Sequence, residues 1–180
     1  MRTFISIKLP PKVLMQIKGI QENLPEFLGR KTELKNLHLT MKFLGEASFE
    51  RTEEIKKRLR QIKFRKFESE IGETGIFDNR KSKRYPRKII VWLSLSNCEG
   101  LQKEVDEALR GLYEKEQRFM GHLTIARVKK VQNKKKFIED LRQINVPKRF
   151  FFIDKFYLME SKPKKEGPEY TVLEEYKLDD

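Results

Sequence analysis

The fold is decided by the stretch Asn36-Leu37-His38-Leu39-Thr40-Met41-Lys42-Phe43, whose centre recurs in the second half of the chain as His122-Leu123-Thr124-Ile125. The chain has only two histidines, and each is followed two places later by one of its seven threonines. Composition alone gives this coincidence a probability of about 0.0015. Histidine has the side-chain pKa nearest neutrality, so two of them facing one pocket could accept and donate protons in a single reaction. The repeat therefore predicts an enzyme.

Residues 36–43 alternate in the manner of a strand with one buried face. The apolar residues at every second position would share the buried face, and His38, Thr40 and Lys42 would share the other. Lys42 is expected either as a solvated lysine at the strand end or as added positive charge at the rim of an RNA site. Residues 119–128 repeat this strand around the second motif.

The rest of the chain predicts an α+β fold. Alternation predicts strands and 3.6-residue periodicity predicts helices. The expected strands are 3–9, 36–43, 64–71, 89–95, 119–128, 150–160 and 170–177, and the expected helices are 11–23, 49–62, 98–116 and 134–144. The second half roughly echoes the first. We therefore expect one domain, residues 1–180, made of two similar, tightly packed lobes. Each lobe would have an antiparallel sheet and flanking helices around a central cleft.

The composition narrows the class of protein. Forty basic residues against 27 acidic ones give a formal charge of +13, which favours a polyanion such as RNA or DNA. A general cationic bias or a heat-adapted source would give the same excess. Cys98 is the only cysteine, and no short metal-ligand spacing is present. The longest apolar runs are far too short to cross a bilayer, and no signal peptide is recognised. We expect a cytoplasmic monomer without a membrane partner.

The paired motif suits the opening of a cyclic phosphodiester. One imidazole would remove a proton from water while the other protonates the departing sugar oxygen, without a metal. Hydroxyls of Thr40 and Thr124 and the guanidinium of Arg127 would stabilise the negative charge on the phosphate oxygens. Strict alternation puts Arg127 on the face opposite His122. Its role therefore requires a bulge or a strand end near Ala126.

These residues match a known family along nearly the whole chain. The two His-x-Thr-x signatures resemble those of the two-histidine phosphoesterase superfamily, and specifically the LigT-like RNA 2′,3′-cyclic phosphodiesterases, formerly called 2′-5′ RNA ligases. The matching stretches are Arg2-Thr3-Phe4-Ile5-Ser6-Ile7, residues 36–45, Gly75-Ile76-Phe77, Val91-Trp92-Leu93 and residues 119–128. The resemblance implies a bilobal α+β fold with a pseudo-twofold axis, hydrolysis of RNA 2′,3′-cyclic phosphate ends to 2′-phosphomonoesters, and no metal or other cofactor.

The resemblance also implies a role for each site residue. His38 would be the acid that protonates the leaving 3′ oxygen, and His122 would be the base. The phosphate would contact Thr40, Thr124 and Arg127. Gly121 departs from the family, where proline is common at this position; glycine restrains the backbone less but removes no chemical group.

A basic loop at residues 78–88 is expected to be exposed and to follow the RNA backbone, or else to carry solvated charge only. Its candidate RNA-binding residues are Arg80, Lys81, Lys83, Arg84 and Arg87. Three functions remain open: the hydrolase, whose RNA could be a tRNA fragment; a 2′-5′ RNA ligase that joins cyclic-phosphate and 5′-hydroxyl ends at the same site; and a noncatalytic RNA- or nucleotide-binding module.

Overall fold

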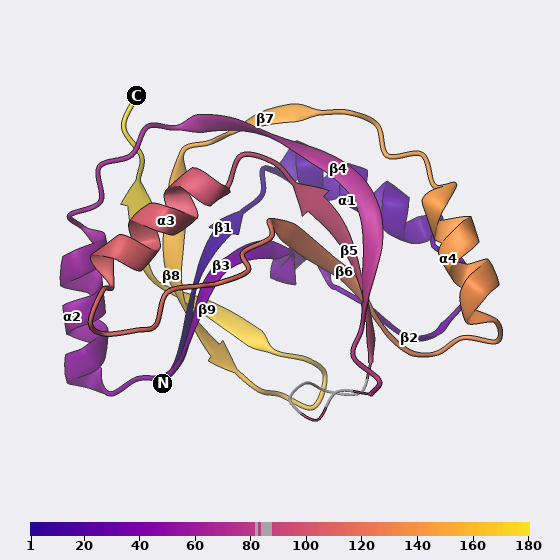
Figure 1. Ribbon diagram of the computed structural model, residues 1–180, viewed down its shortest axis with the longest axis horizontal. Coiled ribbons are helices and arrows are strands. Elements are labelled where there is room, and N and C mark those ends of the chain that lie inside the picture. The colour runs from indigo at the N-terminus through magenta and orange to yellow at the C-terminus, as the bar shows by residue number, and fades with distance from the viewer. Residues whose placement is uncertain (82, 84–87) are drawn as a thin grey trace.

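The computed structural model describes residues 1–81, 83 and 88–180, in which helices are interspersed among the strands (Figure 1). The helices are α1 (Pro11–Glu22), the short 3₁₀ helix η1 (Leu34–Asn36), α2 (Phe49–Leu59), α3 (Glu99–Ala108) and α4 (Lys134–Arg142). The strands are β1 (Arg2–Lys8), β2 (Leu28–Lys31), β3 (His38–Glu46), β4 (Phe67–Asp78), β5 (Ile89–Leu95), β6 (His122–Lys130), β7 (Phe150–Ile153), β8 (Lys155–Lys162) and β9 (Glu169–Lys177).

All of these strands belong to one antiparallel, curved sheet, which confirms the α+β class (Figure 1). Its order is β7-β4-β5-β6-β3-β1-β8-β9, and β2 pairs with β6 beside this path. The order is symmetric about the junction of β6 and β3, because β5 flanks β6 as β1 flanks β3. The sheet passes through this junction without a break, so the division into two lobes stays a prediction.

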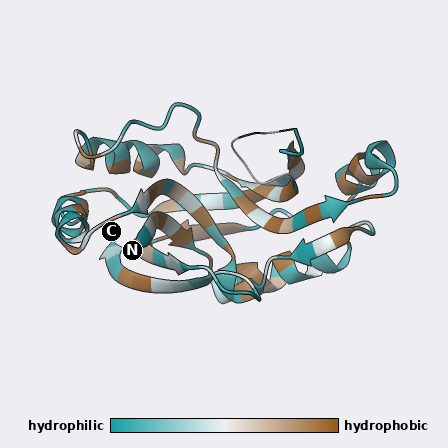
Figure 2. Cartoon of the chain, turned by 90° about the horizontal axis from the view of Figure 1, so that it is seen from below, coloured by the Kyte–Doolittle hydropathy of each residue, from teal (hydrophilic) through white to brown (hydrophobic). Residues whose placement is uncertain are grey.

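The helices form where the sequence supplies starting residues and one apolar face. Pro11 opens α1, a position at which proline costs no hydrogen bond. Ser48 caps α2 by accepting a hydrogen bond from the backbone N–H of Arg51 at 3.2 Å. Ile55 and Leu59 form the buried face of α2. Apolar and polar residues are interleaved along helices and strands, as elements with one buried face require (Figure 2). No helix in the described ranges is long and apolar enough to cross a membrane.

Both motif strands contain a bulge one residue after the threonine. In β3, Thr40 pairs with Ser6 and Lys42 pairs with Ile5, so Met41 is the extra residue. In β6, Thr124 pairs with Trp92 and Ala126 with Val91, which leaves Ile125 extra. A bulge of this kind reverses which face the following side chains occupy. The two strands accordingly have the same order of buried and exposed residues.

The bulge in β3 corrects the expected faces of two residues. Phe43 was expected in the core with Met41, but its side chain is 73% exposed. Lys42 was expected at the rim with His38, but it is 5% exposed and lies inside the protein. Alternation holds only as far as the bulge, which depends on pairing with β1 and leaves no signal in the strand's own sequence.

Other departures from the predicted elements have local causes. Strand β2 was not predicted from the sequence, because its four residues are all exposed and show no alternation. Strand β4 continues past residue 71, the end of the expected strand, and the absence of a side chain at Gly75 leaves room for the ring of Trp92. Helix α3 ends well before residue 116, and the chain then turns at Gly111, whose φ of 77° favours glycine. The expected strand 150–160 is divided at Asp154 into β7 and β8.

Candidate active site

The two motifs meet at the centre of the sheet. Leu39 of β3 and Leu123 of β6 are directly paired, and both are fully buried. Side chains alternate along a strand, so the four polar residues of the motifs share the opposite face: His38, Thr40, His122 and Thr124. Antiparallel pairing further sets each histidine across from the threonine of the other motif. The structure therefore brings together the four residues that the sequence predicted to act as one group.

Both histidine rings are oriented in the same way by the backbone. Nδ1 of His38 lies 2.8 Å from the carbonyl oxygen of Asn36, and Nδ1 of His122 lies 2.8 Å from that of Met120. A carbonyl oxygen only accepts, so each Nδ1 carries a hydrogen and each neutral ring has an unprotonated Nε2. Nε2 of His38 lies 3.1 Å from the hydroxyl oxygen of Thr40, which can donate to it. Each Nε2 is the atom available for proton transfer.

His38 lies in an aromatic enclosure. Its ring centroid is 5.0 Å from that of Phe4 and 5.0 Å from that of Tyr170, which meets it edge-on. Burial lowers the pKa of His38 to about 4, opposed by its hydrogen bond to Asn36, and the positive charge of Arg127 lowers it further. His38 is therefore neutral at pH 7 in the free protein.

His122 has a more open environment. The ring of Phe77 meets it edge-on at 5.2 Å between centroids, and Phe77 in turn contacts Trp92 at 5.4 Å. The hydrogen bond at Nδ1 of His122 is exposed, whereas that of His38 is partly buried. Water therefore has easier access to His122 than to His38.

The bulge in β6 turns Arg127 to the face of the sheet that carries His122, as its predicted role requires. Arg127 follows Ala126 and is exposed, on the same face as His122 and Thr124. Its charge lowers the pKa of His38 and also that of Tyr170, whose pKa is raised above its ordinary value mainly by burial. Arg127 therefore lies near the site, and phosphate binding by it stays a prediction.

Lys42 has a structural role in place of the predicted role at the rim. Its Nζ lies 2.6 Å from Oδ1 of Asp106 in α3 and donates to the carbonyl oxygen of Glu114 at 2.6 Å. The other carboxylate oxygen of Asp106 accepts from Gln102 at 2.7 Å and from the backbone N–H of Glu116 at 3.0 Å. Burial raises the pKa of Asp106, but the hydrogen bond from Lys42 and its other partners hold it below its ordinary value. This ion pair ties β3 to the segment that precedes His122.

The basic loop is only partly described. Arg80 forms a bidentate ion pair with Asp78, at 2.8 and 2.9 Å, and Asp78 also pairs with Lys134. These hydrogen bonds, first that from Arg80, hold the pKa of Asp78 well below its usual range. Lys81 and Lys83 are exposed. Arg84 and Arg87 lie outside the described residues, and RNA contact by this loop stays a prediction.

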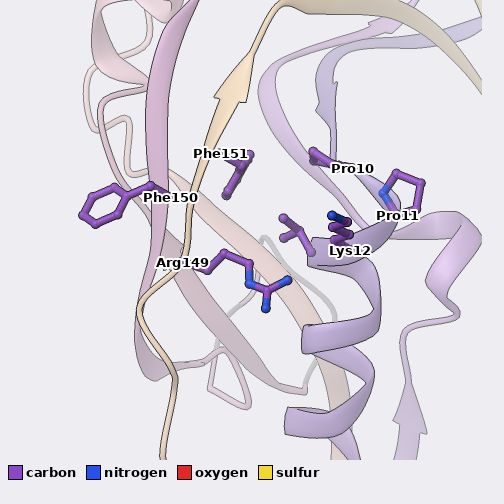
Figure 3. Close-up of a pocket in the computed structure, with 7 residues that line it drawn as sticks. Pro10, Pro11, Lys12, Arg149, Phe150 and Phe151 are labelled. Carbon is purple, nitrogen blue, oxygen red and sulfur yellow. The ribbon is translucent and has the colours of Figure 1, made fainter.

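The structure also shows what lies apart from the histidines. A shallow pocket of about 680 Å³ lies between the start of α1 and β7, and its lining includes none of the four motif residues (Figure 3). In the described ranges, no three side chains of His, Cys, Asp or Glu gather in a way that could hold a metal ion. Cys98 is buried, and burial raises the pKa of its thiol to about 12.

Sequence reasoning missed the aromatic neighbours of the histidines. Phe4, Phe77 and Tyr170 come from strands β1, β4 and β9, far from the motifs in sequence. The predicted alternation of residues 3–9 and 170–177 indicated strands there. It gave no sign that these particular rings would lie against a histidine.

Comparison with known proteins identifies the family of the chain. Residues 7–86 match the family model described as LigT like Phosphoesterase. The RNA 2′,3′-cyclic phosphodiesterase of Methanocaldococcus jannaschii is 32% identical over 98% of this chain and 100% of its own length. That of Thermotoga maritima is 33% identical over 97% of this chain and 94% of its own. The crystal structure of E. coli LigT in apo form matches with a TM-score of 0.76 at 21% identity, covering 99% of this chain and 98% of its own. The chain therefore belongs to the LigT-like phosphoesterase family.

Proposed function

We propose that this protein hydrolyses RNA ends bearing a 2′,3′-cyclic phosphate to 2′-phosphomonoesters, by general acid and base catalysis with two histidines and without a metal. Relatives named RNA 2′,3′-cyclic phosphodiesterase, similar over nearly their whole length, support the substrate class. Both histidines come from one chain, which supports action as a monomer. Fragments of tRNA that end in a cyclic phosphate are suitable substrates.

The observation that carries this proposal is the direct pairing of Leu39 with Leu123. It brings both imidazoles to one face at the centre of the sheet, each with Nδ1 bonded to a backbone carbonyl and Nε2 available. In-line attack on phosphorus needs one group on the side of the water and another on the side of the leaving oxygen. Strands β3 and β6, which are equivalent and adjacent at the centre of the sheet, would supply His38 and His122 as these two groups.

We assign the base to His122 and the acid to His38. Nε2 of His122 accepts the proton of a water molecule, whose oxygen bonds to phosphorus. The bond from phosphorus to O3′ then breaks, and O3′ takes the proton from Nε2 of His38. The open environment of His122 suits contact with water. Nε2 of His38 is unprotonated in the free protein, so His38 must take up a proton from solvent as the substrate binds. The adjacent phosphate anion favours this protonated form, and the low pKa makes it a strong acid.

The threonines and Arg127 have a supporting role in this mechanism. The transition state concentrates negative charge on the non-bridging oxygens, where hydroxyl and guanidinium donors stabilise it more than they stabilise the substrate. Thr40 and Thr124 are diagonally related across the junction, so each can donate to a different oxygen. Arg127 adds positive charge from the strand of His122.

The test uses a short RNA with a terminal 2′,3′-cyclic phosphate in the presence of EDTA. We expect complete conversion to the 2′-phosphate, identified by chromatography against 2′- and 3′-phosphate standards. A 3′-phosphate product, or activity that EDTA abolishes, would contradict the mechanism. A parallel reaction with a 5′-hydroxyl RNA measures ligation; a joined product in excess of the hydrolysed one would make the protein a ligase instead.

A further inference from the structure

Two arginines lie side by side on the histidine face of the sheet. Arg30 of β2 is the direct cross-strand partner of Arg127 of β6. Directly opposed residues in an antiparallel pair point to the same face, with Cβ atoms about 5 Å apart, and like charges there destabilise the pair. Among the described residues, no recorded salt bridge includes either arginine. A bound anion would remove this repulsion.

Strand β2 reaches this position because of a glycine. A side chain at Gly29 would collide with the carbonyl oxygen of Arg127, so only glycine lets the two strands approach here. The pairing is also irregular at this point, between Leu28 and Gly29. The sequence Gly29-Arg30 thus combines close approach with a cation that faces the site.

The side chain of Arg30 is held in place by the turn between β8 and β9. Its Nη1 donates to the carbonyl oxygen of Glu166 at 2.6 Å. The same turn accepts a hydrogen bond from Nδ2 of Asn36 at the carbonyl oxygen of Pro168, at 3.1 Å. The backbone carbonyl of Asn36 in turn holds Nδ1 of His38. Arg30 and His38 are therefore oriented through one segment, and a neutral carbonyl leaves the charge of Arg30 uncompensated.

We propose that Arg30 binds the backbone phosphate that precedes the cyclic phosphate, so that the protein prefers RNA strands to cyclic mononucleotides. This inference rests on the proposed function. An RNA with a cyclic phosphate end has no phosphate beyond it, so the nearest second phosphate is the one on its 5′ side. Arg127 would serve the reactive phosphate, and Arg30 lies on the neighbouring strand, one strand spacing of about 4.8 Å away. The planar guanidinium suits phosphate oxygens.

The test compares a substrate that lacks the second phosphate with one that carries it together with one more nucleoside. One is adenosine 2′,3′-cyclic phosphate, and the other is the dinucleotide adenylyl-adenosine with a terminal 2′,3′-cyclic phosphate. For Arg30→Gln we expect kcat/KM for the dinucleotide to fall about tenfold, through KM, because a charged hydrogen bond is lost. The value for the mononucleotide should stay within about twofold, as for an ordinary surface substitution. Arg30→Lys should restore part of the loss.

The salt dependence gives a second measurement. Loss of one phosphate contact should reduce the slope of log(kcat/KM) for the dinucleotide against log[salt] by about 0.7. Arg51→Gln is the matched control, because Arg51 is exposed on α2 and its substitution removes the same charge. It should behave as wild type with both substrates.

Three results would overturn the inference: equal losses on both substrates, no loss on the dinucleotide, or the same loss in Arg51→Gln. A wild-type protein that hydrolyses neither substrate contradicts the proposed function instead. In that case a binding measurement tests the role of Arg30. The dissociation constant of the dinucleotide with a terminal 2′-phosphate should be about tenfold higher for Arg30→Gln than for wild type. Equal binding would overturn the inference in that case too.

Discussion

Strands β3 and β6 share one backbone design but differ in the side chains after the threonine. Both have a bulge at the same place and the same order of buried and exposed residues. At the first position after the bulge, β3 has the ion-paired Lys42 where β6 has the small Ala126. At the next position, β3 has the exposed Phe43 and β6 has Arg127.

The difference teaches that the backbone places the histidines and their surroundings make them unequal. His38 is enclosed by Phe4 and Tyr170, and burial depresses its pKa. His122 contacts Phe77 and has an exposed hydrogen bond. A repeated strand therefore yields two histidines in different environments, which suits the proposed roles of acid and base.

Substitution of either histidine should have the largest effect. We expect His38→Ala and His122→Ala each to lower kcat for an RNA cyclic phosphate by about 10²–10⁴-fold, the usual contribution of a positioned acid or base. Circular dichroism and thermal unfolding should match those of wild type. Activity of either variant near the wild-type level would contradict a two-histidine mechanism.

A second substrate can show which histidine is the acid. A p-nitrophenyl phosphodiester releases a stable phenolate that needs no proton. With this substrate His38→Ala should lose much less activity than His122→Ala, because only the base is still required. Equal losses on the phenolate substrate would contradict the assignment of His38 as the acid.

Loss of the ion pair between Lys42 and Asp106 should destabilise the protein. Lys42→Met leaves the carboxylate of Asp106 buried without its charged partner, which should lower the free energy of unfolding by about 3–5 kcal/mol in urea denaturation. The double substitution Lys42→Met with Asp106→Leu should recover most of this loss, because no isolated charge remains. Equal losses in the single and double variants would show that packing, and not the charge, is what matters.

Much of the fold could be predicted from periodicity. The motif strands and the shared face of the histidines and threonines depend on local sequence, and the structure agrees with them. The need for a bulge near Ala126 followed from chemistry and alternation together. Strand β2 could not be predicted, because its exposed residues lack a pattern and its pairing is supplied by β6.

The candidate site was predictable where its residues repeat and, with the assumed bulge, at Arg127. Lys42 was placed wrongly because its partner, Asp106, lies in another element and because the bulge depends on pairing between strands. Tyr170 on β9 and Arg30 on β2 also lie far from the motifs in sequence. Contacts between distant segments of this kind leave no signal in a single sequence.

The partly buried ring of His38 should make the stability of the protein depend on pH. In the unfolded chain His38 has a pKa of about 6.5, and in the folded protein its pKa is about 4. Between these values the unfolded state binds a proton that the folded state does not. The free energy of unfolding should therefore fall by up to roughly 3 kcal/mol as the pH drops from 6.5 to 4. For His38→Gln, the free energy of unfolding measured in urea should lack this part of the decline. Parallel plots of that free energy against pH for the variant and wild type would contradict a lowered pKa of His38.

Phe43 and Arg127 give the sharpest comparison of the two strands, because they hold equivalent positions on the same face. Arg127→Gln should lower kcat/KM for an RNA cyclic phosphate by about 10²-fold, as expected when one donor to the transition-state oxygens is removed. Arg127→Lys should retain an intermediate activity, because lysine keeps the charge but loses the planar fork. Phe43→Ala removes a ring that is 73% exposed, so activity should stay within about twofold of wild type. Steady-state kinetics on one substrate measures all three variants. Equal losses in Phe43→Ala and Arg127→Gln would mean that this position serves the site through its shape on both strands, and that the charge of Arg127 is not what the phosphate requires.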